Sequence, residues 1–303
     1  MTLPQLEFEQ RYFVTPDGTK IGYQVFGNPK GQPVLLANGL GGSYLAYCFL
    51  IDHFKDKFRF YCWDYRGVYS SGEPMGGDDS LHIQNHADDA VALLDHEKLD
   101  KVFAFGWSMG VQVLVEMCRH HGDRFDNLVL HKRVAGKAFH TLKGATVTAP
   151  AAKKLLKVSQ RLTRVSRFVV DKLAGSELFV RTIIKAGIAH RDLDKDVFNA
   201  IAARFKELDM GRYAKQLLLL DEHDARDVLP TIYCPVLLVQ GTHDPMTPLS
   251  EAQIMVDAIP NGQLVSLQGG SHYAAVEFPE LMNDHVGQFW LPRLHWSVQA
   301  ASA

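Results

Sequence analysis

The strongest constraint on the fold is an alternation of two kinds of segment along most of the chain. Short apolar runs of β-type residues are separated by longer segments with the apolar spacing of amphipathic helices. This alternation is typical of α/β proteins, in which crossover helices cover a mostly parallel sheet. The expected strands are residues 8–14, 20–26, 33–38, 58–64, 101–107, 128–132, 234–241 and 263–267. The expected helices are residues 44–54, 83–96, 109–121, 250–258 and 279–290.

The directions of the strands follow from the first turn and from the composition of the later apolar runs. A Pro-Asp-Gly turn at residues 16–18 joins the first two strands, which we expect to be antiparallel. The later runs are almost continuously apolar, as in Val-Leu-Leu at residues 34–36, which is typical of parallel strands buried on both faces. We therefore predict an α/β fold with a doubly wound, mostly parallel sheet and N-terminal antiparallel strands.

One long stretch interrupts the alternation and predicts an insertion. Between residues 132 and 234 no strand pattern is present, and helical spacing recurs in segments 151–173, 176–188, 194–208 and 211–220. A structureless loop of this length is uncommon in a compact domain. We expect residues 135–228 to form a helical cap inserted into a core domain made of residues 1–134 and 229–303.

Charge and composition exclude several classes of protein. The chain has 32 Lys and Arg residues against 34 Asp and Glu residues, so it lacks the excess positive charge that indicates nucleic-acid binding. Its 47% hydrophobic content excludes a disordered chain. The charge is uneven, because residues 137–191 hold 12 Lys or Arg residues and only 2 Asp or Glu residues. A solvated helix face explains this basic stretch, and contact with an anionic substrate or a membrane surface is the alternative.

The sequence shows no sign of export, of a membrane span or of a cofactor. No basic segment followed by an apolar one opens the chain, and no apolar run approaches the roughly 18 residues of a membrane span. We therefore expect a cytoplasmic protein without integral membrane contact. Cys48, Cys62, Cys118 and Cys234 stand singly in apolar stretches, which predicts buried free thiols. No motif indicates a metal or an organic cofactor, and the oligomeric state is not indicated.

The segment Gly106-Trp107-Ser108-Met109-Gly110 carries the strongest chemical signal. It follows one expected strand directly and opens an expected helix. A serine on such a tight turn has strained backbone angles, and close neighbouring chains favour glycine two residues away on each side. The turn lifts the hydroxyl out of the sheet and points helix N-terminal amides at the same place. Ser108 is the predicted nucleophile, and the Met109 N–H is a predicted donor to the oxyanion of a tetrahedral intermediate.

A serine nucleophile needs a base, and the base needs an orienting acid. In this architecture the chain order is serine, then Asp or Glu, then His. Asp244 follows the expected strand at 234–241, and His272 follows the one at 263–267. Because the carboxyl ends of parallel strands share one edge of the sheet, we expect both to lie near Ser108. Asp244 is the predicted acid and His272 the predicted base.

Other acids and histidines fit these roles less well. Asp64 precedes the serine, and we expect it to close a structural turn through an ion pair with Arg66. His243 lies in a loop beside Asp244 and is the weaker alternative to His272. No acid follows the expected strand at 128–132, where the acid of such a triad can also stand.

The loop after the expected strand at 33–38 predicts a second oxyanion donor. It begins with Asn38-Gly39-Leu40-Gly41, and its glycines allow backbone amides to face inward. We predict the Leu40 N–H as the donor that acts together with the Met109 N–H. The loop lacks the GxGxxG pattern of a dinucleotide site, and the sequence contains no GxxxxGK[ST] phosphate-binding loop.

With these motifs the chain resembles the α/β-hydrolase fold superfamily, specifically its serine-nucleophile, esterase- or lipase-like members with a helical cap. The resemblance covers residues 8–292, and residues 64–72 are similar to the Asp-x-Arg-Gly-x-Gly-x-Ser segment of the superfamily. It implies the same nucleophile, acid, base and oxyanion amides. Two residues depart from the pattern: Asn38 stands where many members have His, and Tyr69 replaces a Gly.

The expected reaction is hydrolysis of a small carboxylic ester through an acyl-enzyme intermediate. Apolar cap segments at 178–180 and 217–220 favour an apolar acyl or alkyl group, although they can also simply pack the cap onto the sheet. Hydrolysis of a carbon–carbon bond in a vinylogous ketoacid uses the same triad, and thioesterase, acyltransferase, amidase and cofactor-free peroxidase reactions also remain open. A non-enzymatic ligand receptor on the same fold is a less favoured hypothesis.

Overall fold

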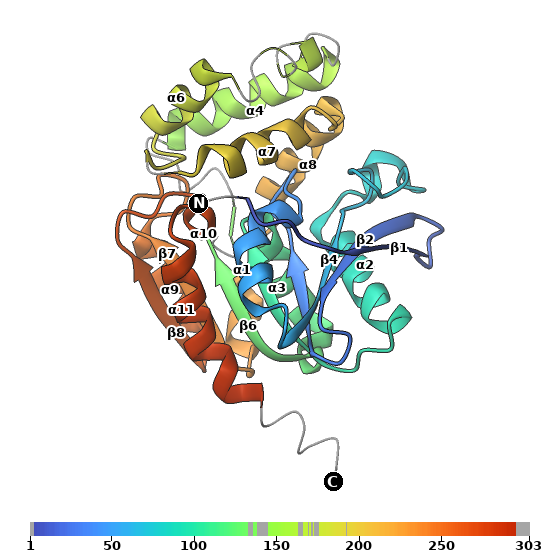
Figure 1. Ribbon diagram of the computed structural model, residues 1–303. Helices are drawn as coiled ribbons and strands as arrows, with labels where there is room; N and C mark the ends of the chain where they lie inside the picture. Colours follow the sequence, from blue (N-terminus) through green and yellow to red (C-terminus); the bar gives the residue numbers. More distant parts are fainter. Residues whose placement is uncertain are drawn as a thin grey trace.

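A mixed sheet forms the centre of the molecule (Figure 1). The computed structural model describes residues 3–132, 136–137, 145–162, 166–168, 170, 172, 176–191 and 193–294. Within them, eight strands lie in the order β1-β2-β4-β3-β5-β6-β7-β8. The β1–β2 and β2–β4 pairs are antiparallel, and every later pair is parallel. The predicted α/β fold with N-terminal antiparallel strands is therefore confirmed.

The strands lie close to the predicted runs. β6 shows the largest difference, because it begins three residues before the expected start. The bounds are β1 (Glu9–Val14), β2 (Lys20–Gly27), β3 (Gln32–Ala37), β4 (Phe58–Trp63), β5 (Val102–Trp107), β6 (Phe125–His131), β7 (Val236–Gly241) and β8 (Gly262–Leu267).

The helices follow the predicted alternation, with additional short turns. The α-helices are α1 (Cys48–Phe54), α2 (Ile83–His96), α3 (Met109–His121), α4 (Ala145–Arg161), α6 (Glu177–Lys185), α7 (Lys195–Phe205), α8 (Met210–Glu222), α9 (Leu249–Ala258), α10 (Ala274–Glu277) and α11 (Pro279–Trp290). The short 3-10 helices are η1 (Tyr44–Tyr47), η2 (Gly77–Ser80), η3 (Gly122–Arg124), η5 (Arg226–Thr231) and η6 (Leu291–Arg293). The segment expected as one helix at 44–54 is thus divided into η1 and α1.

Successive strand residues point to opposite faces of the sheet, which is why it has two cores. On β3, Leu35 packs into the core shared with α2, α3 and α9. Its neighbours Val34 and Leu36 pack into the other core, against α1 and α11. Burial on both faces explains why these strands read as continuous apolar runs.

Helices α4, α6, α7 and α8 form a layer over one end of the sheet, between β6 and β7 in the sequence (Figure 1). Aspartate side chains cap two of them: Asp194 accepts from the N–H groups at the start of α7, and Asp209 does so for α8. Apolar residues of α6 and α7 pack with Cys48 and Val276 of the core. Part of the predicted segment 151–173 lies outside the described residues.

The predicted Asp64–Arg66 ion pair is wrong. The Arg66 guanidinium pairs instead with Asp89 on α2 (2.5 Å) and with Asp17 (2.7 Å). Asp64 accepts hydrogen bonds from the Ser70 hydroxyl (2.5 Å) and the Ser70 N–H (3.1 Å). The reason is that the chain after Asp64 turns back and occupies its carboxylate, while the buried Asp89 offers the guanidinium two parallel hydrogen bonds.

The remaining predictions about the chain concern thiols and membranes. Cys48, Cys62 and Cys118 are buried free thiols as predicted, whereas Cys234 is only half-buried. Among the described residues, no helix combines the length and the apolar character that crossing a bilayer requires.

Candidate active site

The turn between β5 and α3 holds Ser108 in a strained conformation. Its backbone φ is 53° and its ψ is −120°, a combination that residues with a side chain rarely adopt. A Cβ atom added to Gly106 would lie 2.8 Å from the backbone of Gly110, and one added to Gly110 would lie 1.9 Å from the Ala37 carbonyl oxygen. Both glycines are therefore required by the close approach of neighbouring backbone. The Ser108 N–H donates to the His131 carbonyl (2.9 Å), which ties the turn to β6.

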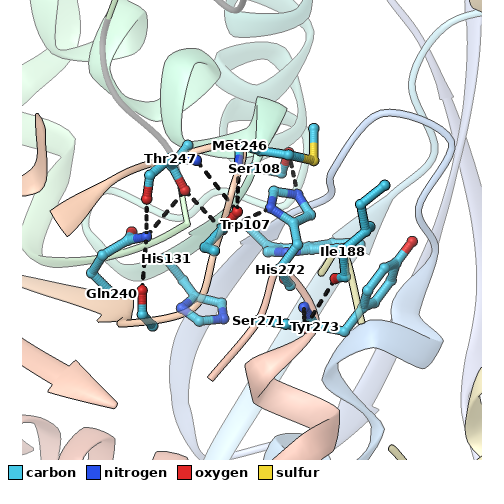
Figure 2. Close-up of polar contacts among 12 residues, drawn as sticks. Trp107, Ser108, His131, Ile188, Gln240, Met246, Thr247, Ser271, His272 and Tyr273 are labelled. Carbon is cyan, nitrogen blue, oxygen red and sulfur yellow. Dashed lines mark hydrogen bonds and ion pairs between the residues drawn. The ribbon is translucent and has the colours of Figure 1, made fainter. Parts of the chain in front are cut away.

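Three residues that are distant in sequence meet at this turn. His272 Nε2 lies 3.2 Å from Ser108 Oγ (Figure 2), and His272 Nδ1 lies 3.0 Å from Asp244 Oδ2. Asp244 also accepts from the Met246 N–H (2.8 Å) and the Thr247 hydroxyl (2.8 Å). These distances are those of a hydroxyl, an imidazole and a carboxylate joined in one hydrogen-bonded line.

Charge around Asp244 keeps its carboxyl group ionised. Burial alone would raise its pKa, but the neighbouring His272 and Lys132, together with the hydrogen bond from Thr247, hold the pKa well below the usual range of an aspartate. An ionised carboxylate can accept the Nδ1–H of His272 and leaves Nε2 as the acceptor toward Ser108.

The structure does not bring the alternative residues to Ser108. His243 is exposed, and its ring nitrogen bonds to the Thr242 hydroxyl (3.1 Å). Asp64 is engaged by Ser70, as described above. Of the two histidines that we considered, only His272 lies within hydrogen-bond distance of Ser108.

The helical layer holds the loop that carries His272. The His272 N–H and the Ser271 hydroxyl both donate to the Ile188 carbonyl, at 3.2 and 2.9 Å (Figure 2). Glu277 accepts from the Ser271 N–H (2.9 Å) and from the His190 N–H (2.8 Å). Residues 188–190 follow α6, so this part of the layer directly supports the imidazole.

The loop after β3 lies against Ser108. A Cβ atom added to Gly39 would lie 3.3 Å from Ser108 Cβ and 2.9 Å from the Trp107 ring. Met109 is the first residue of α3, so its N–H has no acceptor within the helix. Gly39 thus lies beside the Ser108 side chain, and Leu40 lines the same cavity as Ser108.

Tyrosine hydroxyls hold this loop from behind. Three of them donate to carbonyls between residues 37 and 41: Tyr47 to Ala37 (2.5 Å), Tyr65 to Asn38 (2.7 Å) and Tyr69 to Gly41 (2.5 Å). These bonds fix the loop through its carbonyl groups, and the Gly42 N–H adds a bond to the Gly39 carbonyl within the loop (2.9 Å). We call Tyr47, Tyr65 and Tyr69 the tyrosine brace.

Both departures from the superfamily pattern belong to this support. The Asn38 side chain donates to the Trp63 carbonyl (3.1 Å) and the Cys62 thiol (3.3 Å), so it ties the loop to β4. Tyr69 has a φ of 46°, in the left-handed region where glycine is favoured. The Arg204 guanidinium of α7 lies 4.1 Å from the centre of the Tyr69 ring, which helps to hold this conformation.

Lys132 lies directly after β6 and is almost completely buried, at 1% exposure. Its ammonium group has no hydrogen-bond partner among the described residues. Burial lowers the pKa of Lys132 to about 8, although the carboxylates of Asp244 and Glu277 act in the opposite direction. Lys132 lies close to the Asp244–His272 pair, and its charge is one of the causes that lower the pKa of Asp244.

A cavity of about 440 Å³ opens above Ser108, between the sheet edge and the helical layer. The sheet side contributes Leu40, Trp107, Ser108, Met246, His272 and Tyr273. The helical side is mostly apolar, with Phe179, Ile183, Phe198, Ile201, Phe205 and Leu217 among its residues. None of the described lining residues is a Lys, Arg, Asp or Glu, so the basic stretch at 137–191 reaches this cavity through apolar residues such as Ile183 and not through its described Lys and Arg residues. The described residues also contain no cluster of three or more potential metal ligands.

Sequence reasoning missed the tyrosine brace and Lys132. A hydroxyl that donates to a backbone carbonyl leaves no periodic trace in a sequence. A weak signal did exist for Lys132, because it is a charged residue at the end of an apolar strand, at a position where the acid of a triad can stand.

Comparisons with known proteins agree with this architecture. A family model described as alpha/beta hydrolase fold matches residues 32–279. The chain is 25% identical over 273 residues to 3-oxoadipate enol-lactonase 2 of Acinetobacter baylyi, covering 90% of this chain and 94% of that protein. It is 24% identical over 273 residues to the serine hydrolase BPHL of Homo sapiens, covering 89% of this chain and 82% of that protein.

A solved structure has the same fold. The esterase EaEST from Exiguobacterium antarcticum superposes with a TM-score of 0.74 at 18% sequence identity. The match covers 93% of this chain and 99% of that chain. At this level of identity the likeness concerns the fold.

Proposed function

The chain belongs to the alpha/beta hydrolase fold family, and from this premise we propose that it hydrolyses carboxylic esters through an acyl-enzyme intermediate on Ser108. The observation that carries the proposal is the hydrogen-bonded line from Ser108 Oγ through His272 to Asp244, at 3.2 and 3.0 Å. The relatives named as a lactonase and an esterase support this class of bond, since a lactone is a cyclic ester, and the relative named as a serine hydrolase supports a serine nucleophile.

The first half of the reaction acylates the serine. His272 Nε2 accepts the proton of Ser108 Oγ while the oxygen attacks the ester carbonyl carbon. The negative oxygen of the tetrahedral intermediate accepts hydrogen bonds from the Leu40 and Met109 N–H groups. The bond between the carbonyl carbon and the alcohol oxygen then breaks, and His272 gives its proton to the departing alcohol.

The second half releases the acid. His272 accepts a proton from a water molecule, whose oxygen attacks the acyl carbon. The second tetrahedral intermediate collapses, Ser108 Oγ leaves, and it regains its proton from His272. Asp244 remains ionised throughout and stabilises the imidazolium. These steps use side chains, backbone amides and water.

The position of this site also indicates the roles of the two parts of the chain. We infer that residues 1–134 and 229–303 form the catalytic core domain and that residues 135–228 form the cap. The substrate is a small molecule whose apolar part fits the cavity under that cap. Carbon–carbon hydrolysis of a ketoacid is less well supported, because no described residue lining the cavity carries a positive charge for its carboxylates.

Steady-state kinetics with p-nitrophenyl butyrate test the proposal. Ser108→Ala and His272→Ala should each lower kcat by about 10⁴-fold or more, as expected for members of one catalytic unit. The matched control is His243→Ala, which should retain kcat within about twofold because this exposed side chain bonds to the Thr242 hydroxyl and not to Ser108, Asp244 or His272. Hydrolysis that survives in Ser108→Ala would reject the mechanism.

A further inference from the structure

Two tyrosines in the wall of the cavity differ from the other tyrosines near the site. Tyr213 comes from α8, and Tyr273 directly follows His272; both line the cavity above Ser108. Neither hydroxyl has a hydrogen-bond partner among the described residues. The hydroxyls of the tyrosine brace, in contrast, each donate to a backbone carbonyl. A hydroxyl in an apolar wall is unfavourable unless a partner reaches it.

Packing fixes both rings beside the reacting atoms. The Tyr213 ring packs edge-on against Phe205, with ring centres 5.8 Å apart, and a Cβ atom added to Gly41 would lie 3.0 Å from it. The Tyr273 ring lies 5.5 Å from the ring of Trp107 and 5.7 Å from that of Phe198. One hydroxyl thus belongs to a ring next to the oxyanion loop and the other to a ring next to the catalytic imidazole. Rings held by packing can recognise a ligand without first being ordered.

Both hydroxyls are available as donors at neutral pH. Burial raises the pKa of Tyr213 to about 12. Burial raises the pKa of Tyr273 further, and the nearby Tyr213 and Glu277 act in the same direction. Each group therefore keeps its proton, and each can donate to an acceptor inside the cavity.

We infer that the substrate is uncharged and carries a second oxygen acceptor, a keto, ether or hydroxyl oxygen, in the apolar group that fills the cavity, and that Tyr213 and Tyr273 recognise it. This inference rests on the proposed function and adds a substrate class to it. A purely alkyl group would leave both hydroxyls without partners. A carboxylate would have to be buried with no cation among the described lining residues, which is less favourable than either.

Matched esters test the inference on both sides of the ester bond. The acyl series compares p-nitrophenyl hexanoate, p-nitrophenyl 5-oxohexanoate and the mono-p-nitrophenyl ester of adipic acid. The alcohol series compares pentyl acetate with 4-oxopentyl acetate, followed by acid release at constant pH. Each kcat/KM is divided by the rate of hydroxide-catalysed hydrolysis of the same ester, so that intrinsic reactivity cancels.

The informative quantity is the normalised kcat/KM of the keto ester divided by that of the matched alkyl ester. In at least one series this ratio should fall about 3- to 10-fold in Tyr213→Phe or Tyr273→Phe, and further in the double variant, because each change removes one hydroxyl and little else. The adipate monoester should be turned over at least about 10-fold more slowly than the keto ester. Tyr233→Phe is the matched control, since Tyr233 is 73% exposed and should leave every ratio unchanged.

Two results would overturn the inference. One is a keto-to-alkyl ratio that stays within twofold in both series for all Phe variants. The other is a preference for the adipate monoester over the keto ester. If no ester in either series shows Ser108-dependent turnover, the proposed function itself has failed, and this outcome is distinct from a flat ratio among esters that are all hydrolysed.

Discussion

The tyrosine brace offers a prediction about how the oxyanion site is maintained. Tyr65→Phe removes the donor to the Asn38 carbonyl, and Tyr69→Phe removes the donor to the Gly41 carbonyl. These carbonyls flank Leu40, whose N–H is a proposed oxyanion donor. We expect each variant to lower kcat while KM changes little. Substrate binding does not require an ordered oxyanion loop, whereas the transition state does, so the cost of ordering the loosened loop is added when negative charge develops.

The size of the effect follows from the hydrogen bonds that are lost. An unsatisfied buried acceptor costs about 1–3 kcal/mol, and about 1.4 kcal/mol corresponds to a factor of ten in rate. Part of this cost is already present in the folded protein before the reaction and does not raise the barrier. We therefore expect kcat to decrease about 5- to 30-fold in each single variant. The complete loss of one oxyanion donor, about 10²- to 10³-fold, sets the upper limit for the double variant.

The assay is steady-state hydrolysis of p-nitrophenyl butyrate, with the melting temperature measured in parallel. Tyr23→Phe is the matched control, because the Tyr23 hydroxyl bonds to Glu97 on another part of the core. It should lower the melting temperature and leave kcat intact. If the Tyr65 and Tyr69 variants are destabilised and yet keep the kcat of the unaltered protein, the brace does not act on the oxyanion loop.

Three further predictions concern the groups around Ser108. Lys132→Met should move the acid limb of the kcat/KM profile to higher pH by roughly half to one unit, because an imidazolium at the site would lose a like-charged neighbour; Leu130→Ala, a packing change on the same strand, should not move it. Asp244→Asn should lower kcat by about 10⁴-fold. Because the folded-state pKa of Asp244 is depressed, its contribution to stability is present above the ordinary pKa of an aspartate and is lost in stronger acid; the difference in melting temperature between the unaltered protein and Asp244→Asn should therefore shrink below about pH 4. Gly110→Ala should fail to give folded protein in thermal melts and circular dichroism, because its Cβ would lie 1.9 Å from the Ala37 carbonyl oxygen; a normal melting curve would contradict this.

Much of the fold could be predicted from the sequence because its signals are local. The apolar run at residues 34–36 is buried on both faces, and that burial is what makes the run continuous. The requirement for glycine at positions 106 and 110 could equally be predicted from the sequence, and the structure explains it, since a Cβ at either position would collide with backbone. The positions of Ser108, Asp244 and His272, each just after a predicted parallel strand, predicted that they would share one edge of the sheet, where the structure brings them together.

Contacts between residues that are distant in sequence could not be predicted in the same way. Arg66 pairs with Asp89 rather than with Asp64, because the path of the chain between them decides which carboxylate is reachable. The hydroxyls of Tyr65 and Tyr69 reach backbone carbonyls, which every residue has and which no sequence pattern distinguishes. The charge of Lys132 matters through its burial beside Asp244, and burial of a single polar residue cannot be read from an apolar strand.

The activation of Ser108 by His272 is tested most directly by the rate at which a fluorophosphonate modifies Ser108. Peptide mass spectrometry would follow the adduct over time in the unaltered protein and in His272→Ala. We predict a single adduct on Ser108 that forms in step with the loss of esterase activity, and that forms at least about 10³-fold more slowly in His272→Ala. An adduct on another residue, or equal rates in both proteins, would contradict the mechanism.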